Sequence, residues 1–89
     1  MQFKKSDFVV LKSTRKGKKY MAYLKNDPSK KIHFGALGYQ QYKDSTPLKL
    51  YSEYDHNDKD RRDRYYARHK KDIVKGFNPG YLSFLFLWK

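Results

Sequence analysis

Short apolar segments separated by polar turns fill the first third of the chain. Each segment is four or five residues long and rich in β-branched or aromatic residues, which favours extended strands. Gly17 and the run 26–29 (Asn-Asp-Pro-Ser) supply turn chemistry between them. The pattern therefore predicts an antiparallel meander over residues 8–34 with one face exposed to solvent. Its three strands are expected at 8–11, 20–24 and 31–34.

A long helical pattern follows a stretch without any sustained period. Residues 35–56 are expected to form a loop, and a helix is predicted over residues 57–75. Its N-cap is expected at Asn57 or Asp58 and its end at Gly76. Acidic residues crowd its first turn and basic residues its last turn, as the helix dipole favours.

The end of the chain, residues 79–88, is strongly aromatic. Pro79 suits the first turn of a helix, and we predict a short helix here, although Phe84, Phe86 and Trp88 also alternate as they would in a strand. Residues 1–89 are thus predicted to form a single small α+β domain. Its fold would be a three-stranded antiparallel β-meander followed by one long and one short C-terminal helix.

The composition excludes several classes of protein. The 89 residues contain no cysteine, which rules out disulfides, thiolate zinc sites and thiol nucleophiles. The longest apolar run, residues 85–88, is too short to span a bilayer, and no apolar stretch of signal-peptide length follows the first five residues. We expect a protein that acts inside a cell or inside a particle assembled there.

The charge is strongly positive, because 21 Lys and Arg face 9 Asp and Glu and give a formal charge of +12. Such an excess favours association with negatively charged partners. The alternative is a solvated surface that keeps the chain soluble, but +12 exceeds what solubility requires. Basic residues concentrate in 1–31 and 57–89, on either side of a near-neutral, aromatic middle. The candidate binding residues are Lys4, Lys5, Lys12, Arg15, Lys16, Lys18 and Lys19 in the first zone, and Arg61, Arg64, Arg68 and Lys71 in the second.

Nucleic acid and protein are both candidate partners for these zones. Basic residues interleaved with tyrosines can bind phosphates while the rings stack on bases. The chain contains no zinc finger, helix-turn-helix or ribonucleoprotein signature, which argues against reading of a base sequence. The aromatic end favours contact with protein, and Tyr81, Phe84 and Trp88 are the candidate docking residues. For Trp88 the alternative is a place in the core.

The histidines are the one reason to consider an enzyme. His56 beside Asp55, with His69 one helix later, is similar to the ββα-metal (HNH-like) nucleases, but the closely spaced second metal ligand is missing. We therefore expect His56 to assist the helix cap and His69 to pack along the helix. No catalytic residue, metal or cofactor is predicted.

Four strings of residues, in the same order, resemble a family of small, uncharacterised basic proteins of nucleocytoplasmic large DNA viruses, of the phycodnavirus and mimivirus type. They are 19–21, 30–36 with Gly38-Tyr39, 61–71 and 85–88. The likeness spans roughly residues 18–88, and the first strand, the loop at 44–54, Phe84 and Phe86 depart from the pattern. The resemblance implies a viral setting and carries no activity with it.

These inferences give one leading function and two alternatives. The leading expectation is a non-enzymatic structural component of a large DNA virus particle, such as a minor capsid protein, docking on other virion proteins through its basic and aromatic surfaces. The first alternative is a non-specific binder of viral DNA or RNA for genome packaging, and the remote one is the nuclease. The expected location is the virion, or the cytoplasm or nucleus of the infected cell, and the oligomeric state stays open.

Overall fold

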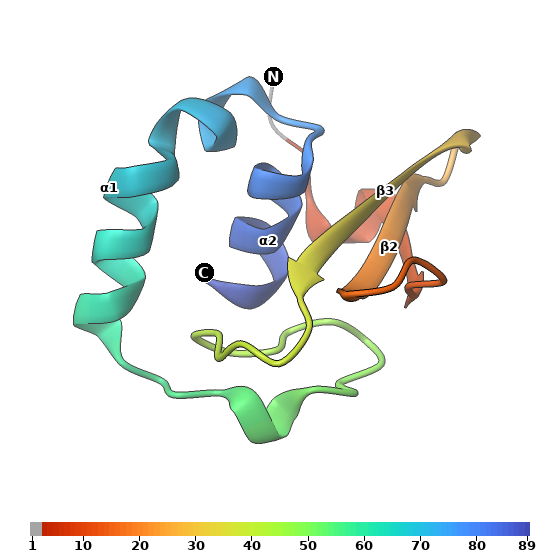
Figure 1. Cartoon of the computed structure of the whole chain (residues 1–89). Coiled ribbons are helices and arrows are strands. Elements are labelled where there is room, and N and C mark those ends of the chain that lie inside the picture. The colour runs from red at the N-terminus through yellow and green to blue at the C-terminus, as the bar shows by residue number, and fades with distance from the viewer. Residues whose placement is uncertain (1–2) are drawn as a thin grey trace.

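The computed structural model describes residues 3–89 and has an antiparallel sheet followed by two helices (Figure 1). The strands are β1 (Phe8–Lys12), β2 (Lys18–Leu24) and β3 (Asp27–Ala36), in the sheet order β1-β2-β3. The helices are α1 (Lys59–Lys75) and α2 (Pro79–Leu87), and two single-turn 3-10 helices occupy Lys5–Asp7 and Ser52–Tyr54. The predicted α+β fold, with its meander and its long and short helices, is confirmed.

The observed strands extend beyond the predicted ones at several ends, and the largest difference is at the start of the third strand. The run 26–29 was expected to be a turn, yet β3 already begins at Asp27, which pairs with Leu24 across a two-residue turn. The pairing becomes irregular between Ala22 and Leu24. Pro28 fits there because β3 is an edge strand, where a residue without a backbone N–H breaks no ladder of hydrogen bonds. The turn signal was therefore real but shorter than its composition suggested.

Both helices begin and end at residues with clear capping roles. The Asp58 side chain accepts hydrogen bonds from the backbone N–H groups of Asp60 and Arg61, which makes Asp58 the N-cap of α1. Asn57 stands outside this helix with a φ of 55°, and Gly76, with a φ of 72°, ends it. The Asn78 side chain caps α2 by accepting from the Tyr81 N–H. The last segment is therefore a helix, as predicted.

The core lies between the sheet and α2. One face of the sheet is lined by Phe8, Val10, Tyr20, Ala22 and Phe34. The buried residues of α2 lie on several of its sides and are Tyr81, Leu82, Leu85, Phe86 and Leu87. A helix with buried residues all round must be covered on more than one side. Figure 1 shows the reason: α2 lies between the sheet and α1. Neither helix among residues 3–89 combines the length and apolarity needed to cross a membrane.

Candidate functional site

A groove of about 530 Å³ opens where α1, the end of α2 and the segment after β3 meet. A second hollow of about 370 Å³ shares Arg61, Arg68 and Trp88 with it and adds Arg64 and Ala67. We call the two together the arginine groove. No aspartate or glutamate lines either part. The main lining residues of the larger part are Arg61, Tyr65, Arg68 and His69 of α1, Ser83, Leu87 and Trp88 at the end of the chain, and Gly35, Tyr39, Gln40 and Gln41 with Lys19 below them.

Helical spacing brings the three arginines of this groove together. Arg61, Arg64 and Arg68 stand three and four residues apart, and such positions share one face of a helix. The Arg61 Nη1 donates to Gln40 Oε1 at 2.9 Å, and Arg64 and Arg68 are exposed. The one ion pair among residues 3–89 is the exposed contact of Arg62 with Asp63, at 3.5 Å. Within residues 3–89, no carboxylate lies within ion-pair distance of the groove arginines.

Stacked rings form one wall of the arginine groove. The Trp88 and Tyr65 rings are parallel within 1° with centroids 4.2 Å apart, and the His69 ring follows Tyr65 at 4.3 Å. On the other side of Trp88, the His56 ring lies 5.1 Å away. Burial raises the pKa of the Tyr65 hydroxyl. This stack joins α1 to the end of the chain, so Trp88 stabilises the fold and lines the groove at once.

The floor of the groove is a buried polar network. Lys19, one of the predicted surface cations, is only 1% exposed, so its predicted placement is wrong. Its ammonium donates to the Tyr39 carbonyl at 2.6 Å and to Gln41 Oε1. Burial lowers the Lys19 pKa, against an opposing effect of the Asp44 and Asp55 carboxylates. A buried ammonium is tolerated only when it is hydrogen-bonded and near countercharge, and this one is both.

Asp44 belongs to the same buried network, farther from the groove, which it does not line. Its carboxylate accepts from the Tyr20 hydroxyl at 2.5 Å, from the Thr46 N–H and hydroxyl at 3.0 and 2.6 Å, and from the Tyr51 N–H at 3.1 Å. Burial and the Asp44 hydrogen bond raise the pKa of Tyr20 to about 12. The sequence showed only a loop here, although an Asp bonded to the N–H two residues on is a local turn signal.

Gly35 allows the floor and the helix layer to approach each other. Its φ is 79°, and a Cβ there would lie 3.0 Å from Leu87 Cδ1 and 3.2 Å from Lys19 Cβ. Any other residue would therefore push apart α2 and the buried Lys19 side chain.

The other predicted binding residues are spread over several surfaces. Lys4, Lys5, Lys12, Arg15, Lys16 and Lys71 are exposed and Lys18 is half-buried, but none of them lines the arginine groove. In the structure, Lys5 lies near Lys43, Lys49 and Lys89, three lysines that were not among the predicted binding residues. Burial and these three lysines lower the Lys5 pKa, and its Nζ donates to Ser45 Oγ at 2.9 Å.

The aromatic end of the chain is mostly core. Tyr81, predicted as a docking residue, is 7% exposed, and its hydroxyl donates to the Phe3 carbonyl at 2.8 Å and accepts from the Phe3 N–H at 3.1 Å. Its predicted exposure is wrong because α2 is covered on several sides. Phe84 is half-buried against Tyr66, at 5.3 Å between ring centroids, in a separate hollow of about 320 Å³.

The histidines lie where packing and capping were predicted. The His56 Nδ1 accepts from the Asp58 N–H at 2.9 Å, so His56 assists the start of α1. His69 packs on Tyr65, and Trp88 and Tyr65 stand between the two histidines in the ring stack. Within residues 3–89, no group of three or more His, Asp or Glu side chains is placed to hold a metal ion.

Comparison with known proteins identifies a family. The model of DUF5754, a family of unknown function, matches residues 8–54, which is more than half of the chain. The chain belongs to this family. The part that matches DUF5754 comprises the sheet and most of the buried floor, whereas α1 and α2 lie beyond it. Neither the curated proteins nor the solved structures contain a match.

Proposed function

We propose that this protein is non-enzymatic and binds nucleic acid, without reading its sequence, through the arginine groove. The observation that carries the proposal is the groove itself: three arginines on one helix face, stacked rings beside them and no carboxylate in the lining. Arginine forks suit phosphate oxygens, and aromatic faces suit bases. The formal charge of +12 adds long-range attraction to any polyanion.

The spacing of the arginines favours a polymer over a single small anion. Arg61 and Arg68 are seven residues apart on α1, which corresponds to about 10 Å along the helix axis. Phosphates repeat along one strand with an axial rise of about 3.4 Å per nucleotide and lie farther apart through space, so a row of this length can meet more than one phosphate of a strand. A mononucleotide would occupy only part of such a row.

Binding without sequence readout fits the surroundings of these arginines. The first turns of α1 also carry Asp58, Asp60 and Asp63, which would be repelled by phosphates if the whole helix entered a groove of DNA. Contact through the arginine side chains, with the helix outside the groove of DNA, keeps Asp63 away from the phosphates, while Asp58 and Asp60 stand three and four residues before Arg61 and Arg64. Phosphate contacts of this kind position a protein but carry no sequence information.

The viral setting is part of the proposal and rests on the resemblance in sequence. In such a setting the protein would package viral DNA or RNA in the virion, or act in the cytoplasm or nucleus of the infected cell. Docking on capsid or other virion proteins is the second candidate function. The hollow beside Tyr66 and Phe84, which Arg62 and Lys89 also line, is what supports it.

The test compares two variants that each lose three positive charges. One carries Arg61→Gln, Arg64→Gln and Arg68→Gln, and the other carries Lys43→Gln, Lys49→Gln and Lys89→Gln on a different, exposed surface. Affinity for a duplex oligonucleotide is measured by fluorescence anisotropy over a series of salt concentrations. The arginine variant should bind at least tenfold more weakly, and its slope of log K against log salt should be lower by about 2 to 3.

The lysine variant is the control for net charge and should keep most of the salt slope. Equal losses in the two variants would mean that total charge, and not the arginine groove, determines binding. Failure of the unmodified protein to bind DNA or RNA even at low salt would refute the proposed function and leave docking on virion proteins as the candidate.

A further inference from the structure

Part of the outer face of the sheet, turned away from α2, is exposed, whereas Lys19 at the start of β2 is buried by the segment that follows β3. Leu11, Met21 and His33 pair across the three strands in one row of this face. Leu11 is 39% exposed and the other two are half-buried, whereas the core-facing residues of the same strands are buried. The face is therefore open to a partner.

Positive charge surrounds this row. His33 lies two residues after Lys31 in β3, and its Nδ1 is 2.7 Å from the Ser13 Oγ, next to the β1–β2 turn that carries Arg15. Besides burial, which is the main cause, the charges of Arg15, Lys18 and Lys31 lower the His33 pKa. Arg15 and Lys31 are exposed and Lys18 is half-buried. Lys18 pairs with Ala36 beside the arginine groove and is left out of the set, and we call Arg15 and Lys31 the sheet cluster.

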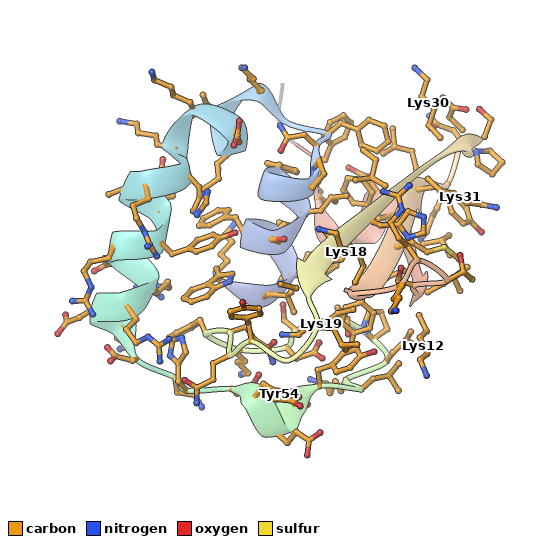
Figure 2. All side chains as sticks on the ribbon, in the orientation of Figure 1. Lys12, Lys18, Lys19, Lys30, Lys31 and Tyr54 are labelled. Carbon is orange, nitrogen blue, oxygen red and sulfur yellow. The ribbon has the colours of Figure 1, made fainter. Side chains whose placement is uncertain are left out.

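Lys31 of the sheet cluster lies on a different side of the molecule from α1, which carries the groove arginines (Figure 2). The sheet and α1 flank α2, and Figure 2 shows Lys30 and Lys31 at the end of the molecule away from α1. The longest dimension of the molecule is 35 Å between Cα atoms. A rigid duplex bound along the face of α1 would therefore leave the outer face of the sheet unoccupied.

We propose that the outer face of the sheet is a second phosphate-binding surface, so that one molecule bridges two segments of nucleic acid. This inference rests on the proposed function of the arginine groove and adds what that function would achieve. One cationic surface only neutralises the strand it covers. Two cationic surfaces on different sides hold two strands together against their mutual repulsion, and the second contact gains from the high local concentration of the first.

The experiment measures bridging separately from binding. A biotinylated duplex on beads is saturated with the protein and washed, a fluorescent duplex of unrelated sequence is added, and its capture is read. The sheet variant carries Arg15→Gln and Lys31→Gln, and the control carries Lys43→Gln and Lys49→Gln. Affinity of each variant for the free duplex is measured in parallel.

The sheet variant should retain affinity for a single duplex within about threefold and lose at least fivefold of the captured fluorescence. The control should keep both. Capture by the sheet variant equal to that of the unmodified protein would overturn the proposal.

Three further results distinguish a failure of the proposed binding site from a failure of the bridging proposal. If the arginine variant binds a single duplex normally while the sheet variant loses binding, the proposed site fails and bridging with it. If the unmodified protein binds one duplex but captures no second one, the proposed function stands and bridging is refuted. If the protein alone sediments as a dimer and the sheet variant as a monomer, the face holds a second copy of the chain, which also refutes the proposal.

Discussion

The polar floor and the arginine groove lie against each other but use positive charge in opposite ways. In the floor, the Lys19 ammonium is buried, bonded to two oxygen acceptors and close to Asp44 and Asp55. In the groove, Arg64 and Arg68 are exposed and no carboxylate lines the walls. The Lys19 ammonium already donates hydrogen bonds inside the molecule. The exposed guanidinium groups of Arg64 and Arg68 can donate hydrogen bonds to a ligand.

This difference shows that the net charge of a basic protein overestimates the positive charge that is accessible to a partner at its surface. Burial of an unpaired ammonium costs several kcal/mol, so a buried lysine has to come with its own acceptors. Such a lysine contributes to the fold and little to recognition. Exposed arginines contribute little to stability, because surface charges are worth about 0 to 1 kcal/mol each. Substitutions should therefore separate the two regions cleanly.

The largest effect is expected in the floor, from Asp44→Ala. This change leaves the Tyr20 hydroxyl, the Thr46 N–H and the Tyr51 N–H without their acceptor and removes countercharge from Lys19. The free energy of unfolding should fall by about 3 to 5 kcal/mol, as when one partner of a buried network is removed. Urea denaturation followed by circular dichroism measures it.

The matched control is Asp63→Ala, which removes an exposed carboxylate with one surface ion pair. It should change the free energy of unfolding by less than about 0.5 kcal/mol. If Asp44→Ala costs no more than this control, the floor is not what holds the 39–55 segment in place, and the contrast between the two regions is lost.

The sequence predicted the elements of this fold better than its polar contacts, for a physical reason. Capping by Asp58 and Asn78 and the stop at Gly76 are local signals that involve residues a few positions apart. The partners of the floor are distant: Tyr20 and Asp44 are 24 residues apart, and Lys19 and Gln41 are 22. No local pattern announces such pairs.

Only the part of the candidate site that depends on local spacing could be predicted from the sequence. The helical spacing of Arg61, Arg64 and Arg68 could be seen in the sequence. The opposite wall, which Tyr39 and Gln40 form, could not, because a loop of 22 residues was expected there without internal structure. Tyr81 was predicted to be an exposed docking residue, but it is buried in the core. The sequence of a short chain does not distinguish an aromatic residue of the core from one of a docking surface.

A smaller effect on the free energy of unfolding is expected from acidification, through His56, which lies where the two regions meet. His56 follows Asp55 of the floor, stacks near Trp88 of the groove wall, and accepts the Asp58 N–H in its neutral form. Burial, and next the charge of Arg61, lower the His56 pKa. The folded state therefore binds this proton less readily than the unfolded state. The stability that neutral His56 contributes is complete above the unfolded pKa of about 6.5 and is lost as the pH falls through the lower folded pKa.

The measurement is the free energy of unfolding from pH 7.5 to 5.0, compared between the unmodified protein and His56→Asn. The amide oxygen of Asn can accept the Asp58 N–H at any pH in this range, so the variant should lose less stability on acidification. His33, whose pKa is lowered as well, acts in the same direction in both proteins and cancels in the comparison. Identical pH profiles would show that His56 does not couple the cap of α1 to protonation.

The smallest effect tests Tyr39, which belongs to both regions. The Tyr39 carbonyl accepts from Lys19 in the floor, while its ring, 71% exposed, lies at the rim of the groove. Tyr39→Ala keeps the carbonyl and removes only the ring, so the free energy of unfolding should change by less than about 0.5 kcal/mol. Stacking of a base on an aromatic side chain is worth about 1 to 3 kcal/mol, so affinity for single-stranded DNA should fall at least about fivefold while affinity for duplex DNA stays within about twofold. Tyr66→Ala, which removes a ring outside the groove, should leave affinity for single-stranded DNA unchanged. If Tyr39→Ala instead destabilises the fold and leaves single-strand binding unchanged, Tyr39 belongs to the floor alone, and the exposed rings of the groove take no part in binding.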